Sequence, residues 1–169
     1  MDFLPEEVDN FVTKNTENEP DILNELNHET WEKVLIPRML SGHLQGRVLS
    51  MLTHMINPKT ILEIGTYTGY SAICMAEGLE KGGKIHTIDI NEELESMVKK
   101  YIVKAGLQDT IINHVGNAMD IIPTLQDTFD LVFIDADKTN YANYYDLVFD
   151  RVNKGGYIRQ RYANTHCLF

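Results

Sequence analysis

The strongest constraint on the fold of this chain is the regular alternation of apolar and helical segments between residues 60 and 158. Residues 60–64, 84–90, 110–115 and 129–134 are short apolar runs, which predict strands. The segments between them carry apolar residues at helical spacing, which predicts helices. This alternation is typical of right-handed βαβ units, and it predicts an α/β fold with a doubly wound parallel sheet.

The expected helices fill the gaps between these strands. Glycine pairs such as Gly82-Gly83 mark the point where a helix ends. The pattern predicts helices over residues 70–80, 91–105 and 140–152, a helical turn over 120–125, and a fifth strand that starts at Tyr157 after Gly155-Gly156.

Two more helices are expected before the first strand, where they form an N-terminal helical cap. One begins with Asp21 as its N-cap and runs to about residue 35, and the other begins with Ser41 as its N-cap and runs to residue 56. We divide the chain into an N-terminal helical segment, a ligand-binding domain and an atypical tail, which cover residues 1–38, 39–158 and 159–169.

The charge balance restricts the partners of the protein. The 169 residues hold 15 Lys and Arg against 25 Asp and Glu, a net charge of −10. A phosphate surface repels such a field, so binding to nucleic acid or to a membrane surface is not expected. The acidic N-terminus lacks the features of a signal peptide, and Cys74 lies in an apolar helical pattern typical of a buried free thiol. These features indicate a cytoplasmic protein.

Ligands of doubly wound sheets bind beyond the carboxyl ends of the strands, so the loops that follow the strands carry the candidate site. The first loop, residues 63–71, has Gly65 at the sharp turn and Gly69 where the helix packs. Tyr67 takes the place of the middle glycine of the dinucleotide fingerprint, which lets backbone approach a pyrophosphate. The loop therefore favours a ligand without a pyrophosphate over a nicotinamide dinucleotide, although a plain strand-to-helix turn gives the same pattern.

The next two loops add groups suited to an adenosine. Asp89 ends the second strand, where a carboxylate can accept hydrogen bonds from both ribose hydroxyls, although a cap for the next helix is an alternative role. Residues 116–119 follow the third strand, and their small side chains leave room for a flat adenine ring. An ordinary tight turn is the alternative for this loop.

Two carboxylates and a lysine follow the fourth strand, namely Asp135, Asp137 and Lys138. Charges at the end of an apolar strand are costly unless they are paired, liganded or used in chemistry. Asp135 could bind a hard cation such as Mg²⁺ through oxygen, and Lys138 could serve as a general base. A surface ion pair between Asp and Lys is the alternative.

Residues 39–158 resemble the cation-dependent, S-adenosylmethionine-dependent O-methyltransferases of the caffeoyl-CoA and catechol O-methyltransferase group. Four blocks carry the resemblance, and the glycine-loop block is quite specific: Met39-Leu40-Ser41 with Gln45-Gly46, then ILEIGTYTGYSA, IHTIDIN and FDLVFIDADK. The resemblance implies a Rossmann-like methyltransferase sheet. It also implies methyl transfer from S-adenosylmethionine to a hydroxyl of a small catechol-like or acyl-CoA-linked phenolic acceptor, and it is compatible with a homodimer.

The resemblance assigns a role to each matching position. It makes Asp135 the first metal ligand and Lys138 the lysine that assists deprotonation of the acceptor hydroxyl. The divalent cation, with Mg²⁺ as the expected ion, would hold two adjacent hydroxyls and lower the pKa of the one that attacks. The other matches are to cofactor-binding positions: Ser41 at the methionine end, Glu63, Gly65 and Thr66 in the first loop, Ser71 at the amino-acid carboxylate, Asp89 at the ribose, Ala118 at the adenine, and Asp137 on the side shared by cofactor and substrate.

The chain departs from the family pattern after residue 158. The family has an Asp-Asn pair that completes the metal site at the positions held here by Arg161 and Tyr162, and two more strands follow it. Residues 159–169 show no strand pattern, as expected of a truncated or altered product, and the cation site is expected to be weakened. Two functions stay open: an O-methyltransferase, or an inactive remnant that binds the cofactor or dimerises without catalysis.

Overall fold

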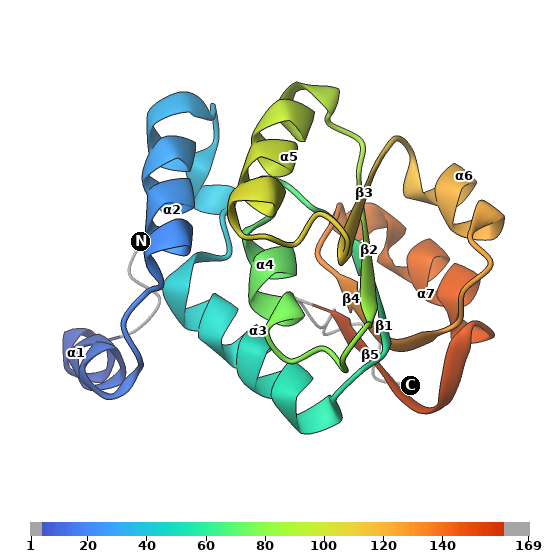
Figure 1. The fold of residues 1–169 in the computed structure, drawn as a ribbon, viewed down its shortest axis with the longest axis horizontal. Coiled ribbons are helices and arrows are strands. Elements are labelled where there is room, and N and C mark those ends of the chain that lie inside the picture. Colours follow the sequence, from blue (N-terminus) through green and yellow to red (C-terminus); the bar gives the residue numbers. More distant parts are fainter. Residues whose placement is uncertain (1–4, 161–169) are drawn as a thin grey trace.

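The computed structural model describes residues 5–160 and has a five-stranded parallel sheet at its centre (Figure 1). The strands are β1 (Thr60–Ile64), β2 (Lys84–Asp89), β3 (Ile111–Val115), β4 (Phe129–Ile134) and β5 (Val152–Gln160). The helices are α1 (Glu6–Asn15), α2 (Asp21–Lys33), α3 (Gly42–Ile56), α4 (Tyr70–Ala76), α5 (Glu95–Lys104), α6 (Ala118–Ile121) and α7 (Tyr141–Phe149), with 3₁₀ turns η1 (Pro37–Met39), η2 (Glu92–Leu94), η3 (Ile122–Thr124) and η4 (Lys138–Asn140).

The sheet is doubly wound, as the alternation predicts. The strand order is β3-β2-β1-β4-β5, and β1 pairs in parallel with β2 on one side and with β4 on the other. The chain thus adds β2 and β3 on one side of β1, crosses back, and adds β4 and β5 on the other side. The switch point lies between β1 and β4, and in such sheets the ligand crevice opens outside the carboxyl ends of these strands.

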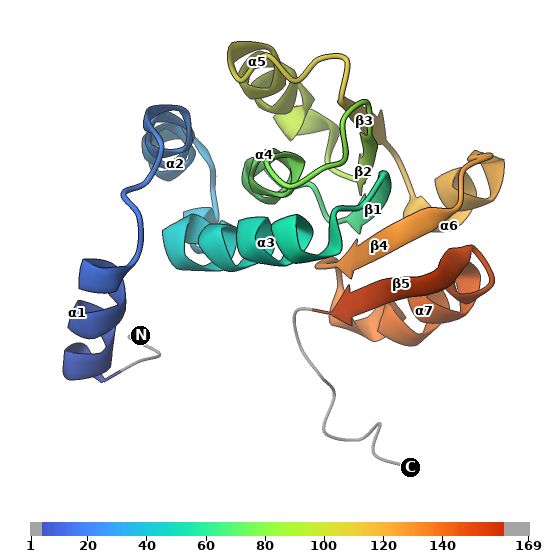
Figure 2. The ribbon, with the colours of Figure 1, turned by 60° about the horizontal axis from the view of Figure 1, so that its bottom comes forward.

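Apolar side chains cover both faces of the sheet, which is why the central strands read as continuous apolar runs. One face packs against α2, α3, α4 and α5 through residues such as Ile61, Leu131 and Leu23. The other face packs against α6 and α7 through residues such as Leu62 and Val132. Figure 2 shows these two layers on either side of the sheet, with α1 standing apart from them.

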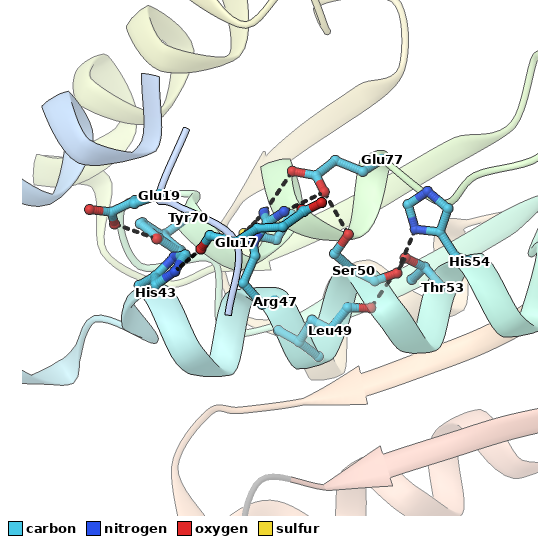
Figure 3. A network of polar contacts seen from close by, with 11 residues as sticks. Glu17, Glu19, His43, Arg47, Leu49, Ser50, Thr53, His54, Tyr70 and Glu77 are labelled. Atoms are coloured by element: carbon cyan, nitrogen blue, oxygen red, sulfur yellow. Dashed lines mark hydrogen bonds and ion pairs between the residues drawn. The ribbon is translucent and has the colours of Figure 1, made fainter. Parts of the chain in front are cut away.

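A polar network fixes α3 against α4 (Figure 3). The Arg47 guanidinium donates to both carboxylate oxygens of Glu77 at 2.9 and 2.7 Å, and the Ser50 hydroxyl donates to Glu77 Oε2 at 2.5 Å. The helices also approach closely, because a Cβ on Gly46 would lie 2.7 Å from the sulfur of the buried free thiol of Cys74. The middle of α3 is therefore held close to α4 and to the residue that follows it.

The last helix and strand differ from the prediction. The helix predicted to run to Val152 ends at Phe149, and β5 begins at Val152 rather than at Tyr157. Val152 pairs with Phe129 at the start of β4, and this pairing is between residues distant in sequence, so local pattern does not show it. Gly155-Gly156 lies within β5 at a register shift and does not end the helix.

One predicted helix cap is wrong and one is confirmed. Asp21 is the first residue of α2, and Pro20 occupies the N-cap. Ser41 occupies the N-cap of α3 as predicted, although its backbone is already helical and its side chain makes no capping hydrogen bond. Asn91 and Asn117, by contrast, accept hydrogen bonds from the backbone of the turns that follow them.

Within residues 5–160, no helix is both long enough and apolar enough to cross a membrane. Arg161, Tyr162 and Cys167 lie outside the described residues.

Candidate functional site

A cavity of about 370 Å³ opens at the switch point, beyond the carboxyl ends of β1, β2, β3 and β4. Four strand-to-helix loops and the connection between α2 and α3 form its walls. The lining residues are Met39, Leu40, Ser41, Ile64, Gly65, Thr66, Tyr67, Thr68, Tyr70, Ser71, Ile88, Asp89, Ile90, Gly116, Asn117, Ala118, Asp135, Ala136, Asp137 and Tyr144.

The first loop needs a glycine where β1 ends. Gly65 has φ of +107°, and a Cβ there would lie 2.5 Å from the carbonyl oxygen of Asp135 in the neighbouring loop. No side chain fits at that distance, so Gly65 allows the loops after β1 and β4 to meet. The Gly65 N–H donates to the Ile88 carbonyl at 2.8 Å, which ties the loop to β2 as well.

Tyr67 and Asp89 join the loops after β1 and β2. Tyr67 has φ of +51°, a left-handed conformation that is rare for an aromatic residue. In this conformation its backbone N–H donates to Asp89 Oδ2 at 2.6 Å. Asp89 Oδ1 accepts from the backbone N–H of Asn91 at 2.9 Å. The carboxylate is thereby fixed at the cavity wall, and because a carboxylate offers about four acceptor positions, both oxygens keep capacity for a ligand.

Glu63 lies beneath the cavity and is fully buried. Its Oε2 accepts from the Thr87 hydroxyl at 2.5 Å, and the Thr66 and Thr87 hydroxyls are themselves 2.5 Å apart. Its Oε1 has no well-aligned hydrogen-bond partner among the described residues. Burial, together with the smaller effect of the charges of Asp135 and Asp89, raises the pKa of Glu63 to about 8, although hydrogen bonds from the Ser71 and Thr87 hydroxyls lower it.

The third loop provides a small residue at the cavity wall. Asn117 Oδ1 accepts from the Met119 N–H at 3.0 Å and so caps α6, which begins at Ala118. Ala118 is buried and lines the cavity. The loop is a tight turn whose side chains still leave space beside Asp89 and Ile90.

The fourth loop holds its two carboxylates differently. Asp135 is half-buried at the cavity wall. Asp137 is exposed, and its oxygens accept from the Tyr144 hydroxyl at 2.7 Å, the Thr139 hydroxyl at 2.9 Å and the Asn140 amide at 2.5 Å. Desolvation raises the pKa of Asp137, but these three hydrogen bonds outweigh it and lower the pKa below its ordinary value. Asp137 is thus bound to its own helix turn.

Eight of the ten site residues predicted from the sequence line this one cavity: Ser41, Gly65, Thr66, Ser71, Asp89, Ala118, Asp135 and Asp137. The other two do not. Glu63 is buried beneath the wall, and Lys138 is exposed at the start of η4, next to the cavity-lining Asp137. The roles that the resemblance gives to all ten remain predictions.

Sequence reasoning missed several residues of the site. Tyr144 packs in the core and also lines the cavity, and nothing in the sequence pattern distinguishes it from a plain core residue. Thr87 donates to Glu63, and its signal in the sequence is a hydroxyl in the middle of an apolar strand, which indicates a buried polar partner. Leu40 and Ile90 also line the cavity, and although both stand in blocks that carry the family resemblance, the resemblance gives them no role.

The described residues do not assemble a complete set of metal ligands. Between residues 5 and 160, no three His, Cys, Asp or Glu side chains come together in a way that could hold a metal ion. Asp135 lines the cavity, and both oxygens of Asp137 accept hydrogen bonds from the protein. The positions that the resemblance assigns to the remaining ligands, Arg161 and Tyr162, lie outside the described residues.

The fold and the cavity define a Rossmann-like α/β protein with its candidate ligand site at the switch point. More specifically, the chain belongs to the O-methyltransferase family, because the model of that family matches residues 13–165. It is 41% identical over 126 residues to caffeoyl-CoA O-methyltransferase 1 of Eucalyptus globulus, an alignment that covers 72% of this chain and 50% of that protein. It is 40% identical over 153 residues to caffeoyl-CoA O-methyltransferase of Petroselinum crispum, with 87% and 62% covered. The chain thus spans between about half and three-fifths of the length of these relatives.

Solved structures agree with this family. The SAH-bound methyltransferase of Podospora anserina has a TM-score of 0.86 at 30% identity, over 95% of this chain and 73% of that chain. The O-methyltransferase TomG of Streptomyces achromogenes, solved in complex with SAM, has a TM-score of 0.84 at 29% identity, over 91% and 70%. The Rossmann-like methyltransferase fold predicted from the sequence is therefore confirmed.

Proposed function

We propose that the switch-point cavity binds S-adenosylmethionine and that the protein transfers the methyl group to a hydroxyl of a small phenolic acceptor, catechol-like or linked to an acyl-CoA. The observation that carries the proposal is the convergence of Ser41, Gly65, Ser71 and Asp89 on one cavity of about 370 Å³. The similar structures solved with bound SAH or SAM, and the similar caffeoyl-CoA O-methyltransferases, support it.

The residues present fit this cofactor. The Asp89 carboxylate is fixed by two backbone N–H groups and can still accept hydrogen bonds from ribose hydroxyls. Glu63 supports the cavity wall from beneath, because its Oε2 accepts from the Thr87 hydroxyl, which in turn contacts the hydroxyl of the cavity-lining Thr66. Ser71 offers a buried hydroxyl at the wall, and Ala118 leaves room for a flat ring.

Bound S-adenosylmethionine supplies a methyl group activated by the positive charge on sulfur. The protein would contribute mainly alignment, because holding two reactants in line removes much of the entropic barrier. Asp89 and Ser71 would hold the two ends of the cofactor, and Lys138, at the edge of the cavity, would accept the proton that leaves the acceptor hydroxyl. The acidic net charge of −10 favours a small acceptor over nucleic acid.

Binding of a divalent cation has weaker support than binding of S-adenosylmethionine. Mg²⁺ is usually bound through one or two carboxylates with several waters, and no three His, Cys, Asp or Glu side chains of residues 5–160 come together in a way that could hold a metal ion. The described residues therefore do not fit a complete cation site, and we assign no step of the reaction to it.

A second function is favoured by the position of Lys138. Its side chain is exposed and is not among the residues that line the cavity. A protein with an intact cofactor site but no placed base would bind S-adenosylmethionine without turnover, as a cofactor-binding or dimerising remnant. The two functions share the cavity and differ only in catalysis.

The experiment that separates them is a methyl-transfer assay on the purified 169-residue protein. S-adenosylmethionine is offered with catechol or with caffeoyl-CoA, and S-adenosylhomocysteine and a product heavier by one methylene are followed by mass spectrometry. Formation of both at equal rates supports the O-methyltransferase. Saturable binding of S-adenosylhomocysteine with no product supports the second function, and neither binding nor product contradicts both.

A further inference from the structure

The connection between α2 and α3, residues 34–41, forms one wall of the cavity, and we call it the strap. Its outer side is largely exposed to solvent, since 95% of the surface of Leu35 and 48% of that of Ile36 are accessible. Its inner side contributes the last three residues of the strap to the cavity wall: Met39, Leu40 and Ser41. Whatever holds the strap in place must therefore act from the inner side.

Both ends of the strap are attached to fixed helices. On α2, Glu29 accepts hydrogen bonds from Lys100 and Tyr101 of α5. On α3, Arg47 is paired with Glu77 just after α4 (Figure 3). Because its ends cannot move far, motion of the strap is limited to its middle, where η1 lies.

The Tyr67 side chain holds this middle part. Its hydroxyl donates to the carbonyl oxygen of Ile36 at 2.9 Å. The same carbonyl accepts the N–H of Met39 at 3.0 Å and so closes the turn that presents Met39 to the cavity. One oxygen atom thus links Tyr67, in the first glycine loop, to the shape of the strap.

The Tyr67 backbone has a strained conformation that allows both of its contacts. A left-handed conformation costs a non-glycine residue free energy and persists only where the surroundings impose it, often at functional sites. Glycine would adopt φ of +51° without strain, yet a tyrosine stands here. The conformation directs the Tyr67 N–H to Asp89 while the ring reaches Ile36, so one residue contacts both the ribose-side carboxylate and the strap.

We propose that Tyr67 is a positioning residue that latches the strap over the cavity and couples strap closure to the carboxylate of Asp89. The ligand under the strap is S-adenosylmethionine or its product, and in that respect the inference rests on the proposed function. The latch sets how long the ligand stays bound. It acts through Ile36 and Met39.

The test uses Tyr67→Phe, which keeps the ring and the backbone and removes only the hydroxyl. Loss of one neutral hydrogen bond should speed strap opening by about three- to tenfold. Hydrogen exchange at the amides of Met39 and Leu40 should accelerate by about this factor without ligand, and release of bound S-adenosylhomocysteine, measured by displacement, should accelerate likewise. The matched control is Tyr157→Phe, which removes the hydroxyl of an exposed tyrosine on β5 that does not line the cavity and should change neither rate.

The possible outcomes either support or overturn the role of Tyr67 as a latch. Faster exchange in the strap together with faster release in Tyr67→Phe supports the latch. Unchanged exchange, or faster exchange with unchanged release, overturns it. If the unsubstituted protein binds no S-adenosylhomocysteine, the proposed function fails by itself, and the exchange rates of the free protein still decide whether Tyr67 holds the strap.

Discussion

The backbone N–H of Tyr67 donates to Asp89 Oδ2 across 2.6 Å, so the loop after β1 and the carboxylate at the end of β2 form one unit. Asp89 owes its orientation to this bond and to the Asn91 N–H on its other oxygen. A carboxylate held in this way does not have to be ordered when a ligand arrives, which reduces the entropic cost of binding.

Asp89→Ala should abolish high-affinity cofactor binding. Two hydrogen bonds from ribose hydroxyls to a charged acceptor are lost, so the affinity for S-adenosylhomocysteine in calorimetry should fall by at least about 100-fold. Asp109→Ala, which removes an exposed aspartate away from the cavity, is the control and should bind like the unsubstituted protein. Full affinity in a folded Asp89→Ala variant would show that the cavity is assigned wrongly.

Gly65→Ala should destabilise the fold much more than Gly82→Ala. Both glycines have positive φ, but a Cβ on Gly65 would meet the Asp135 carbonyl at 2.5 Å, whereas nothing lies within 4 Å of a Cβ on Gly82. We expect a loss of about 3 kcal/mol at Gly65 and about 1 kcal/mol at Gly82 in urea unfolding. Equal losses would mean that the loops after β1 and β4 can separate at little cost.

Glu29 should make the protein sensitive to acid. Hydrogen bonds from Lys100, Tyr101 and Lys33 lower its pKa from 4.5 to about 2. A depressed pKa stabilises the fold fully above pH 4.5, and this contribution is lost as the pH falls from 4.5 toward 2. The side chain is near the surface, so the contribution is about 1 kcal/mol or less after solvent screening.

The measurement is the urea midpoint of the protein and of Glu29→Gln at neutral pH and in acid. The difference between the two proteins should shrink as the pH falls through this window. Glu32→Gln, on the same helix and exposed, provides the control for loss of a charge alone. A difference in urea midpoint that stays constant with pH would show that Glu29 does not cause the acid sensitivity.

Lys138→Ala should separate binding from turnover. If Lys138 accepts the hydroxyl proton, its loss should lower kcat with caffeoyl-CoA or catechol by about 100-fold or more and leave the affinity for S-adenosylhomocysteine unchanged. Lys154→Ala removes an exposed lysine on β5 and should change neither quantity. Turnover that survives in Lys138→Ala would assign the base to another group.

The fold could be predicted because its central strands are buried on both faces. Ile61 and Leu62 face opposite layers of helices, so both of these adjacent positions in β1 are apolar, and Leu131 and Val132 are apolar in β4 for the same reason. The start of β5 could not be predicted, since Val152 becomes a strand residue only by pairing with Phe129. Gly155-Gly156 resembles a helix end in sequence and is a register shift in the sheet.

The candidate site residues that stand at the ends of strands could be predicted from the sequence. Gly65 and Asp89 stand at strand ends, and strand ends can be read from the sequence. The side-chain contacts of Tyr67 could not be read in this way, because the Ile36 carbonyl lies 31 positions earlier in the chain. Glu63 is buried beneath the cavity wall and Lys138 is exposed on the surface beside it. Neither placement could be predicted from the residue type.

The most direct test of the central claim is a calorimetric titration of the unsubstituted protein with S-adenosylhomocysteine, with and without Mg²⁺, and with NAD as the control ligand. The cavity assignment predicts saturable binding at one site per chain, the same affinity in the presence of a chelator, and no binding of NAD. A folded protein that binds NAD, or that binds no S-adenosylhomocysteine, would contradict it.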